Sequence, residues 1–216
     1  LDGVTGKKIW DIDSLFQPSR RGIVGYINEK NEEYLFVPVA GRIYKIDAKN
    51  GKLVKSFGNN GSISSLTIVA PMVYNDSLVS VSIRRSVDVF DINSGIKQFS
   101  ISVHGARNFS GGAPWGGAAL DKTKEIVYIV TGNPLPSLYG VNRPGENKNT
   151  SSIVAFDLKK RNILWAFQDV NHDLWDYDIA SPPIIHNLEI EGKLFETVIA
   201  LTKTGNVILL DRNNGK

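Results

Sequence analysis

The chain has 216 residues, of which 42% are hydrophobic, and its 25 basic and 22 acidic residues give a formal net charge of +3. This length is sufficient to bury a hydrophobic core and favours one domain over residues 1–216. The basic residues are scattered, which argues against a nucleic-acid partner. There is no cysteine, so disulfides, thiolate metal sites and cysteine nucleophiles are excluded. No apolar run approaches the length of a membrane-spanning helix.

A short turn motif recurs along the chain. Every copy begins with aspartate, whose side chain can bond the backbone two residues later, and glycine four positions on supplies the positive φ that such turns need. Arg161 replaces this glycine in the fourth copy, so we expect that turn to differ. The copies are DGVTGK (2–7), DAKNGK (47–52), DINSGI (91–96), DLKKRN (157–162) and DRNNGK (211–216).

Between the turns lie short β-branched runs bounded by Gly, Asn, Asp and Pro, and no stretch has the periodicity of a helix. The turns recur about every 45 residues, with one longer interval between Asp91 and Asp157. A four-stranded antiparallel sheet repeated at this period is typical of a β-propeller blade. We therefore predict an all-β propeller with about four blades, of which the first and last are incomplete. A β-sandwich with coincidental turns is the alternative.

The sequence starts at one copy of the turn and stops at another. Its N-terminus would thus supply an outer strand, and its C-terminus the inner strands of a sheet. The two ends could pair and close a small ring. The other option is a part of a larger propeller, either a fragment with missing blades or a half that associates with another, because open sheet edges need covering.

The turns together with HDLWDYD (172–178) and TKTGN (202–206) resemble the quinoprotein dehydrogenases. These enzymes carry pyrroloquinoline quinone (PQQ) in an eight-bladed propeller. The similarity runs from Arg21 to the C-terminus and includes APWGGAALD, TGNPLP and NRPGEN. With leucine at position 174, the HDLWD motif resembles that of the membrane glucose dehydrogenase and polyol-oxidising branch of the family. The resemblance implies a partial quinoprotein propeller domain over residues 1–216.

The resemblance also implies a catalytic base and a metal site. Asp176 matches the base that removes the hydroxyl proton of the substrate, and a carboxylate near a cation stays ionised for this task. Asn133 and Asp176 match oxygen ligands of a metal ion next to the cofactor, with Asp178 as a further ligand. Such hard ligands suit Ca²⁺ or Mg²⁺, and a lanthanide is the less favoured option. Arg84 and Arg85 stand near the place of a glutamate ligand that the alcohol-oxidising members have.

Three further residues match the cofactor contacts of the family. Lys203 corresponds to the basic residue that bonds the reacting quinone oxygens, and a fixed cation there stabilises negative charge on the reduced cofactor. Arg21 corresponds to an arginine that grips a cofactor carboxylate with its bidentate fork. Trp115 corresponds to the indole that stacks on the quinone plane. The histidines show no zinc spacing, and we expect a structural hydrogen bond from His172; the three are His104, His172 and His186.

The implied function is a PQQ-dependent oxidoreductase for a sugar or polyol hydroxyl. Without a haem motif, electrons would leave to a separate quinone or cytochrome acceptor. The resemblance also implies a periplasmic location, with any membrane association through a part outside this chain. Two alternatives remain open, namely a non-catalytic scaffold or binding propeller and a degenerate homologue that does not turn over.

Overall fold

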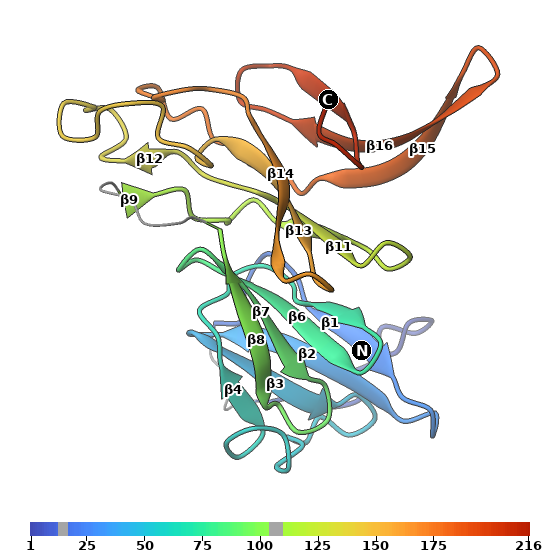
Figure 1. The fold of residues 1–216 in the computed structure, drawn as a ribbon. Coiled ribbons are helices and arrows are strands. Elements are labelled where there is room, and N and C mark those ends of the chain that lie inside the picture. The colour runs from blue at the N-terminus through green and yellow to red at the C-terminus, as the bar shows by residue number, and fades with distance from the viewer. Residues whose placement is uncertain (13–16, 104–109) are drawn as a thin grey trace. The chain divides into compact units, whose positions relative to one another are not determined.

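The computed structural model describes residues 1–12, 17–103 and 110–216 (Figure 1). Every regular element in these ranges is a β-strand, which confirms the all-β prediction, and no helix there could cross a membrane. The chain divides into two compact units. Unit 1 contains Leu1–Ser80 and Val89–Phe99, and unit 2 contains Val81–Asp88 and Ser100–Lys216. His104 lies outside the described residues.

Three of the sheets have four strands, as the repeat predicts, and the strands follow one another in chain order. The boundary between the units passes through the second of these sheets. The first sheet contains β1 (Val24–Ile27), β2 (Glu33–Val39), β3 (Arg42–Asp47) and β4 (Ser62–Ser64). The second contains β5 (Met72–Tyr74), β6 (Ser77–Ser82), β7 (Ser86–Asp91) and β8 (Lys97–Ser102). The third contains β10 (Ala118–Asp121), β11 (Ile126–Val130), β13 (Ser152–Asp157) and β14 (Asn162–Gln168).

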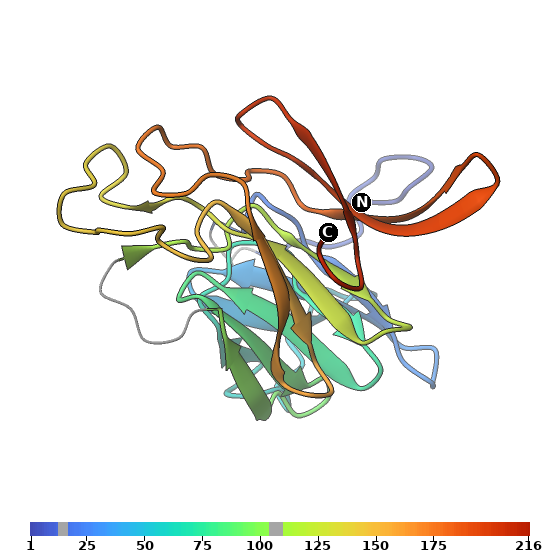
Figure 2. The same cartoon turned by 45° about the horizontal axis from the view of Figure 1, so that its top comes forward.

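The fourth sheet has only three strands among the described residues, which confirms that the last sheet is incomplete. They are β15 (Ile184–Ile190), β16 (Lys193–Leu201) and β17 (Val207–Asp211), in that order. The β15–β16 hairpin is long and curved (Figures 1 and 2). A small separate ladder pairs β9 (Ser110–Gly111) with β12 (Pro134–Leu135). This ladder belongs to the long interval between the third and fourth turns.

The hydrophobic core of unit 2 lies between its two large sheets. Strands β11 and β13 are buried along their whole length. Ile153 and Ala155 of β13 join Val198 of β16 and Leu210 of β17 in one cluster. Burying both faces of the central strands explains why these segments are apolar at successive positions rather than alternating.

The aspartate turns form as predicted. The carboxylate of Asp47 accepts the backbone N–H of Lys49 at 2.9 Å, and that of Asp211 accepts the N–H of Asn213 at 2.7 Å. We expected the turn at Arg161 to differ from the others, but its backbone angle does not. Arg161 has a φ of +59°, and Gly51 at the same place in the second turn has +72°. The arginine accepts a left-handed conformation that usually belongs to glycine, at a cost of roughly 1 kcal/mol.

Two tryptophans connect neighbouring repeats through these turns. Trp10 follows the first turn and packs on Gly51 of the second, and Trp165 follows the fourth and packs on Gly215 of the fifth. Each indole N–H donates to a backbone carbonyl of the turn that it covers, at 2.7 and 3.1 Å respectively. A Cβ on either glycine would lie 2.6–2.7 Å from the indole ring. Glycine is therefore needed both for its backbone conformation and for this close approach.

Gly215→Ala is expected to destabilise unit 2 by about 2 kcal/mol more than Gly192→Ala does. The two glycines have nearly the same φ, +72° and +74°, but a Cβ at Gly192 meets nothing within 4 Å. The difference between the variants isolates the clash with Trp165 from backbone strain. Urea unfolding followed by tryptophan fluorescence measures it, and equal midpoints would show that the indole moves aside freely.

A charged network fixes the last turn of unit 2. Glu196 of β16 accepts the ammonium of Lys124 at 2.6 Å and the guanidinium of Arg212 at 2.8 Å. Asn213 donates to the same carboxylate at 3.0 Å. The hydrogen bonds from Lys124, Asn213 and Arg212 lower the pKa of Glu196 to about 2. Since the carboxylate ionises more readily in the folded state, the network stabilises the protein in the ionised form.

The contribution of Glu196 to stability is expected to disappear at low pH. Its folded pKa is lowered from 4.5 to about 2, so the contribution is fully present above pH 4.5 and is lost as pH falls through 2. Glu196→Gln should therefore lower the free energy of unfolding at pH 7 and flatten its decline between these two values. Chemical unfolding at several pH values tests this, with Glu189→Gln on β15 as the control. A steep decline that persists in Glu196→Gln would assign the acid sensitivity to other groups.

Candidate functional site

The acidic stretch 171–178 folds around a buried carboxylate. Asp173 is 1% exposed, and its two oxygens accept the backbone N–H groups of Trp175 at 2.8 Å and Tyr177 at 2.7 Å. Ser151 donates its hydroxyl to the same carboxylate at 3.1 Å. Between the two bonded N–H groups lies Asp176, which has a φ of +63°. Asp173 thus holds a tight loop that presents Asp176.

A buried arginine supports this loop. Arg143 is 1% exposed although it carries a charge, and its guanidinium donates to four acceptors. Burial lowers the pKa of Arg143, and the charge of Asp173 opposes this effect; a guanidinium remains protonated in such surroundings. The acceptors are the backbone oxygens of Pro136, Ser137 and Asp173 and the Oδ1 of Asn147.

His172 has the structural role that we expected. Its Nδ1 lies 2.7 Å from the carbonyl oxygen of Gly145. Its ring also packs on Gly140, where a Cβ would lie 2.3 Å from Nε2. These contacts fasten the start of the acidic loop to the segment that carries Arg143.

Lys203 joins the two carboxylates that follow. Its ammonium donates to Asp176 Oδ2 at 3.1 Å and to Asp178 Oδ1 at 2.7 Å. Burial alone would lower the pKa of Lys203, but the hydrogen bonds to Asp178 and Asp176 outweigh it, so the pKa is raised. The Asp178 side chain is 4% exposed and that of Asp176 is 53% exposed. Asp178 therefore anchors the lysine, and Asp176 keeps an accessible face.

Trp115 completes this cluster. Its indole N–H donates to Asp178 Oδ2 at 2.7 Å, and the Lys203 ammonium lies 5.7 Å from the centre of its ring. Gly132 lies against the edge of the indole, where a Cβ would be 2.8 Å from Nε1. One half-buried aromatic ring is thus held between a carboxylate, a cation and a flat backbone surface.

Asn133 follows the glycine that touches Trp115. Its side-chain Nδ2 is buried and has no hydrogen-bond partner among the described residues. A buried amide without a partner is costly and often marks a position that a ligand completes. An amide can also present its oxygen from nearly the same place after a flip. This is the feature of the structure that fits a metal ligand at Asn133.

Hydrogen bonds therefore bring together four of the six residues singled out in the sequence, namely Trp115, Asp176, Asp178 and Lys203. Asp176 and Asp178 share Lys203 as a partner, and the backbone between them is not extended because Asp176 has a left-handed φ. Arg21 belongs to unit 1, where its backbone N–H donates to Ser19 Oγ at 3.1 Å. Its role toward a cofactor remains a prediction.

The oxygen donors of the site are few. Within the described ranges no group of three or more His, Cys, Asp or Glu residues could hold a metal ion. Two carboxylates and one amide are hard donors that suit Ca²⁺ or Mg²⁺, but calcium takes about six to eight oxygens. The chain thus fits a metal ion that also receives ligands from a bound cofactor or water.

Sequence reasoning missed Asp173, Arg143 and Gly132. Two signals were present: Asp173 is the first acid of the HDLWDYD motif, and Arg143 is the only charged residue of NRPG (142–145). What the sequence does not display is that both would be buried and would meet at one backbone carbonyl.

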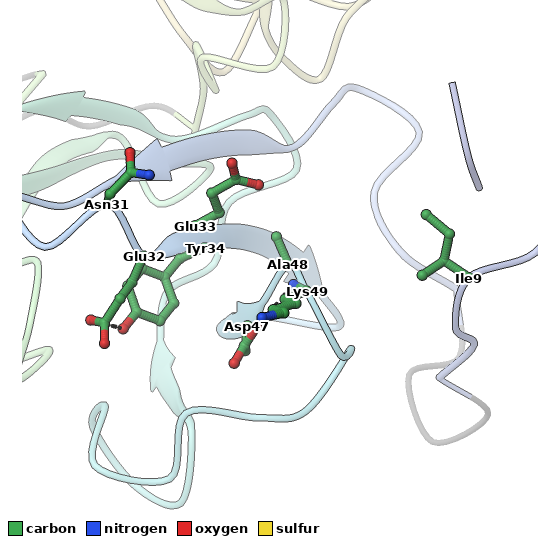
Figure 3. Close-up of a pocket in the computed structure, with 8 residues that line it drawn as sticks. All are labelled: Ile9, Asn31, Glu32, Glu33, Tyr34, Asp47, Ala48 and Lys49. Atoms are coloured by element: carbon green, nitrogen blue, oxygen red, sulfur yellow. Dashed lines mark hydrogen bonds between the residues drawn. The ribbon is translucent and has the colours of Figure 1, made fainter. Parts of the chain in front are cut away.

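A separate cavity of about 650 Å³ lies in unit 1 (Figure 3). It is lined by Glu32, Glu33 and Asp47 among others, and Ile9 stands apart from the rest of the lining. None of the predicted site residues lines it. Tyr34 donates to Glu32 at 2.9 Å there, and Asn28 donates to the same carboxylate at 2.7 Å, so Glu32 is already engaged.

Comparison with known proteins identifies related sequences. The family model described as "PQQ: Glucose/ethanol/alcohol dehydrogenase, beta-propeller domain" matches residues 89–216. The quinoprotein glucose dehydrogenase of Escherichia coli (strain K12) is 27% identical over 270 residues, which cover 100% of this chain and 34% of that protein. The glycerol dehydrogenase large subunit of Gluconobacter oxydans (strain 621H) is 28% identical, with 100% of this chain and 36% of that protein covered. The chain thus spans about a third of the length of these relatives.

A europium-containing methanol dehydrogenase is similar in structure, with a TM-score of 0.71 and 23% sequence identity. The match covers 91% of this chain and 40% of that one. At this identity the likeness shows the fold, and it agrees with a partial propeller built from repeated four-stranded sheets.

Proposed function

The chain belongs to the family of PQQ-type glucose/ethanol/alcohol dehydrogenase β-propeller domains, and on this premise we propose that it forms part of the active site of a PQQ-dependent dehydrogenase for a sugar or polyol hydroxyl. The observation that carries the proposal is the cluster in which Lys203 binds both Asp176 and Asp178 while Asp178 binds Trp115. When bound, the quinone would accept the hydride that leaves the alcohol carbon, and a metal ion would polarise the quinone carbonyl.

Asp176 is the proposed base. Its carboxylate is half exposed, so a substrate hydroxyl can reach it, and the Lys203 ammonium lies 3.1 Å from it. In the proposed reaction the hydroxyl proton moves to Asp176 as the alcohol carbon is oxidised. Asp178 does not compete for this role because it is almost fully buried and is bonded on both oxygens.

Trp115, Lys203 and Arg21 are the proposed cofactor contacts, together with Asn133. The indole is oriented by its bond to Asp178, so it offers a fixed flat surface for a planar ring. Lys203 is partly exposed and places its charge beside that surface, where it can stabilise negative charge on quinone oxygens. Arg21 would bind a cofactor carboxylate.

Asn133, Asp176 and Asp178 are the proposed metal ligands. The support is the unpartnered amide of Asn133 and the half-exposed carboxylate of Asp176. Asp178 would bind the ion through the lone pairs that Trp115 and Lys203 leave on its oxygens. Calcium is the proposed ion, with magnesium second and a lanthanide less favoured, since all three accept hard oxygen ligands.

The sugar or polyol substrate class is proposed from the names of the glucose and glycerol dehydrogenase relatives. A quinone or cytochrome electron acceptor and a periplasmic location are proposed with it. A non-catalytic propeller is the second candidate, because only part of each relative is covered. It predicts a folded chain that binds no PQQ.

Titration of the chain with PQQ in the presence of calcium, followed by tryptophan fluorescence, tests the proposal. We expect saturable quenching that depends on calcium and is lost in Trp115→Ala. Trp175→Phe is the matched control, because Trp175 is 73% exposed and makes no side-chain contact with the cluster in the described structure.

Two outcomes would count against the proposal. A folded chain that shows no saturable quenching would favour the scaffold. Quenching that survives in Trp115→Ala but disappears in Trp175→Phe would place the quinone elsewhere. Equilibrium dialysis of PQQ gives a readout that does not depend on either indole.

A further inference from the structure

Ser151 lies at the point where the segments that carry the candidate site are bonded to one another. It comes directly before β13 and is 0% exposed. Its N–H donates to the carbonyl oxygen of Gly132 at 2.9 Å, and its own carbonyl oxygen accepts the N–H of Asp169 at 2.9 Å. Its hydroxyl donates to Asp173 Oδ2 at 3.1 Å. A buried residue whose polar groups are all bonded holds its neighbours in one arrangement.

The N–H of Ser151 leads to the side of the site that contains the indole. Gly132 donates its own N–H to the carbonyl oxygen of Ala113 at 2.9 Å, and it lies against the ring of Trp115. The next residue is Asn133, a proposed metal ligand. The N–H of Ser151 therefore fixes the peptide group from which Asn133 extends.

The hydroxyl of Ser151 leads to the proposed base. Asp173 Oδ2 accepts this hydroxyl and also accepts the N–H of Tyr177 at 2.7 Å. That N–H belongs to the peptide group directly after Asp176. The hydroxyl is thus two hydrogen bonds from the backbone of the base, and one carboxylate oxygen makes the connection.

The carbonyl oxygen of Ser151 leads to the lysine turn. Asp169, whose N–H it accepts, also accepts the hydroxyl of Thr204 at 3.2 Å, and Thr204 directly follows Lys203. One buried residue is therefore linked to all three segments of the site.

The backbone conformation of Ser151 separates the role of its hydroxyl from that of its main chain. Its φ is +45°, in the left-handed region that glycine adopts without strain. A glycine could make both backbone bonds, so the serine adds its hydroxyl at the cost of backbone strain, and strained positions of this kind cluster at functional sites. The flanking hydroxyls differ, because those of Thr150 and Ser152 bond to backbone carbonyls of their own segment.

We propose that Ser151 is a positioning residue for the proton transfer to Asp176, an inference that rests on the proposed function. Its hydroxyl holds the Asp173 carboxylate, and with it the loop that presents Asp176, at a fixed distance from the indole side of the site. Ser151 is fully buried and acts through Asp173. Proton transfer needs the hydroxyl and the base within hydrogen-bond reach, and a misplacement of about 1 Å can lower a rate by about a hundredfold.

Ser151→Gly isolates the hydroxyl, because it removes the side chain and leaves the left-handed backbone unstrained. We expect kcat for dye-coupled sugar oxidation to fall by about tenfold to a hundredfold, while KM and the dissociation constant of PQQ stay within about threefold. Ser152→Ala is the matched control, because Ser152 is equally buried and its hydroxyl bonds Thr150 rather than the loop. It should keep the original kcat. A full rate in Ser151→Gly overturns the proposal, and so does an equal loss in Ser152→Ala.

Hydrogen exchange of the chain without cofactor gives a second readout. In Ser151→Gly the amide of Tyr177 should exchange about tenfold faster, because its acceptor is no longer held by the hydroxyl. The amide of Ala155, in the core strand β13, should exchange as before. Equal acceleration at both amides would mean a general loss of stability in unit 2 and would overturn the proposal.

The two measurements separate this inference from the function on which it rests. An unmodified chain that binds no PQQ overturns the proposed function, and the role of Ser151 in the reaction with it. An unmodified chain that binds PQQ and oxidises sugar, with unchanged exchange at Tyr177 in Ser151→Gly, overturns the inference about Ser151 alone.

Discussion

Asp176→Asn is expected to lower the rate of PQQ-dependent sugar oxidation by about a thousandfold and to leave PQQ binding within a few-fold of the original. Asparagine has nearly the same shape and can still accept the Lys203 hydrogen bond, which runs to Asp176 Oδ2 at 3.1 Å. It cannot take up the substrate proton. Dye-coupled oxidation of glucose and glycerol, together with equilibrium dialysis of PQQ, measures the two effects.

Asp169→Asn is the matched control for this experiment. The Asp169 carboxylate accepts the hydroxyl of Thr204 at 3.2 Å, next to Lys203 in sequence, but contacts neither Trp115 nor Asp178 in the described structure. It should keep the full rate. If Asp176→Asn kept its rate while Asp178→Asn lost it without losing the fold, the base would be Asp178. Equal loss of PQQ binding and rate in Asp176→Asn would instead make Asp176 a binding residue.

Arg143→Met is expected to destabilise unit 2 by about 3 kcal/mol or more. Methionine fills much of the space, but it leaves the oxygens of Pro136, Ser137 and Asp173 and the amide of Asn147 without their buried donor. The loop around Asp176 should also loosen, since Arg143 holds it through the Asp173 carbonyl. Urea unfolding gives the stability, and hydrogen exchange of the Trp175 and Tyr177 amides reports the loop.

Lys148→Met tests whether the loss of any cation in this segment has the same effect. Lys148 is 82% exposed, and its ion pair with Glu146 is long at 3.9 Å. Exposed pairs of this kind contribute little, so the variant should unfold like the original chain. A small effect of Arg143→Met, similar to that of Lys148→Met, would mean that water replaces the lost donor and that the segment is not held by its arginine.

The strand content and the turns could be predicted because their signals are local. Aspartate at the start of each turn bonds a nearby N–H, as Asp47 does with Lys49, and short β-branched runs lie between the turns. At Arg161 this local reasoning was too strict, because an arginine adopts the φ expected of glycine. The surrounding sheet, which pairs β13 with β14, determines the conformation there.

The site was predicted only in part. The resemblance pointed to Trp115, Asp176, Asp178 and Lys203, which the structure brings together. The hydrogen bond from Trp115 to Asp178 joins residues 63 positions apart, and nothing local in the sequence announces it. The burial of Arg143 is equally unforeseen, since arginine is ordinarily a surface residue. Contacts of this kind depend on the packing of whole segments, which periodicity and turn motifs do not encode.

The packing of a tryptophan against the glycine of the following turn has a consequence for where such chains can change in length. Besides the apolar core between the facing sheets, one contact between neighbouring repeats uses one indole and one glycine, as Trp165 and Gly215 show. A loop that grows between two strands leaves this joint in place. The segment that carries Asn133 and Arg143 is such a loop, between β11 and β13 in the longest interval, although Phe99 and Arg161 take the places of the tryptophan and the glycine there. Residues of the candidate site can thus be added between strands while the strands stay in their sheets.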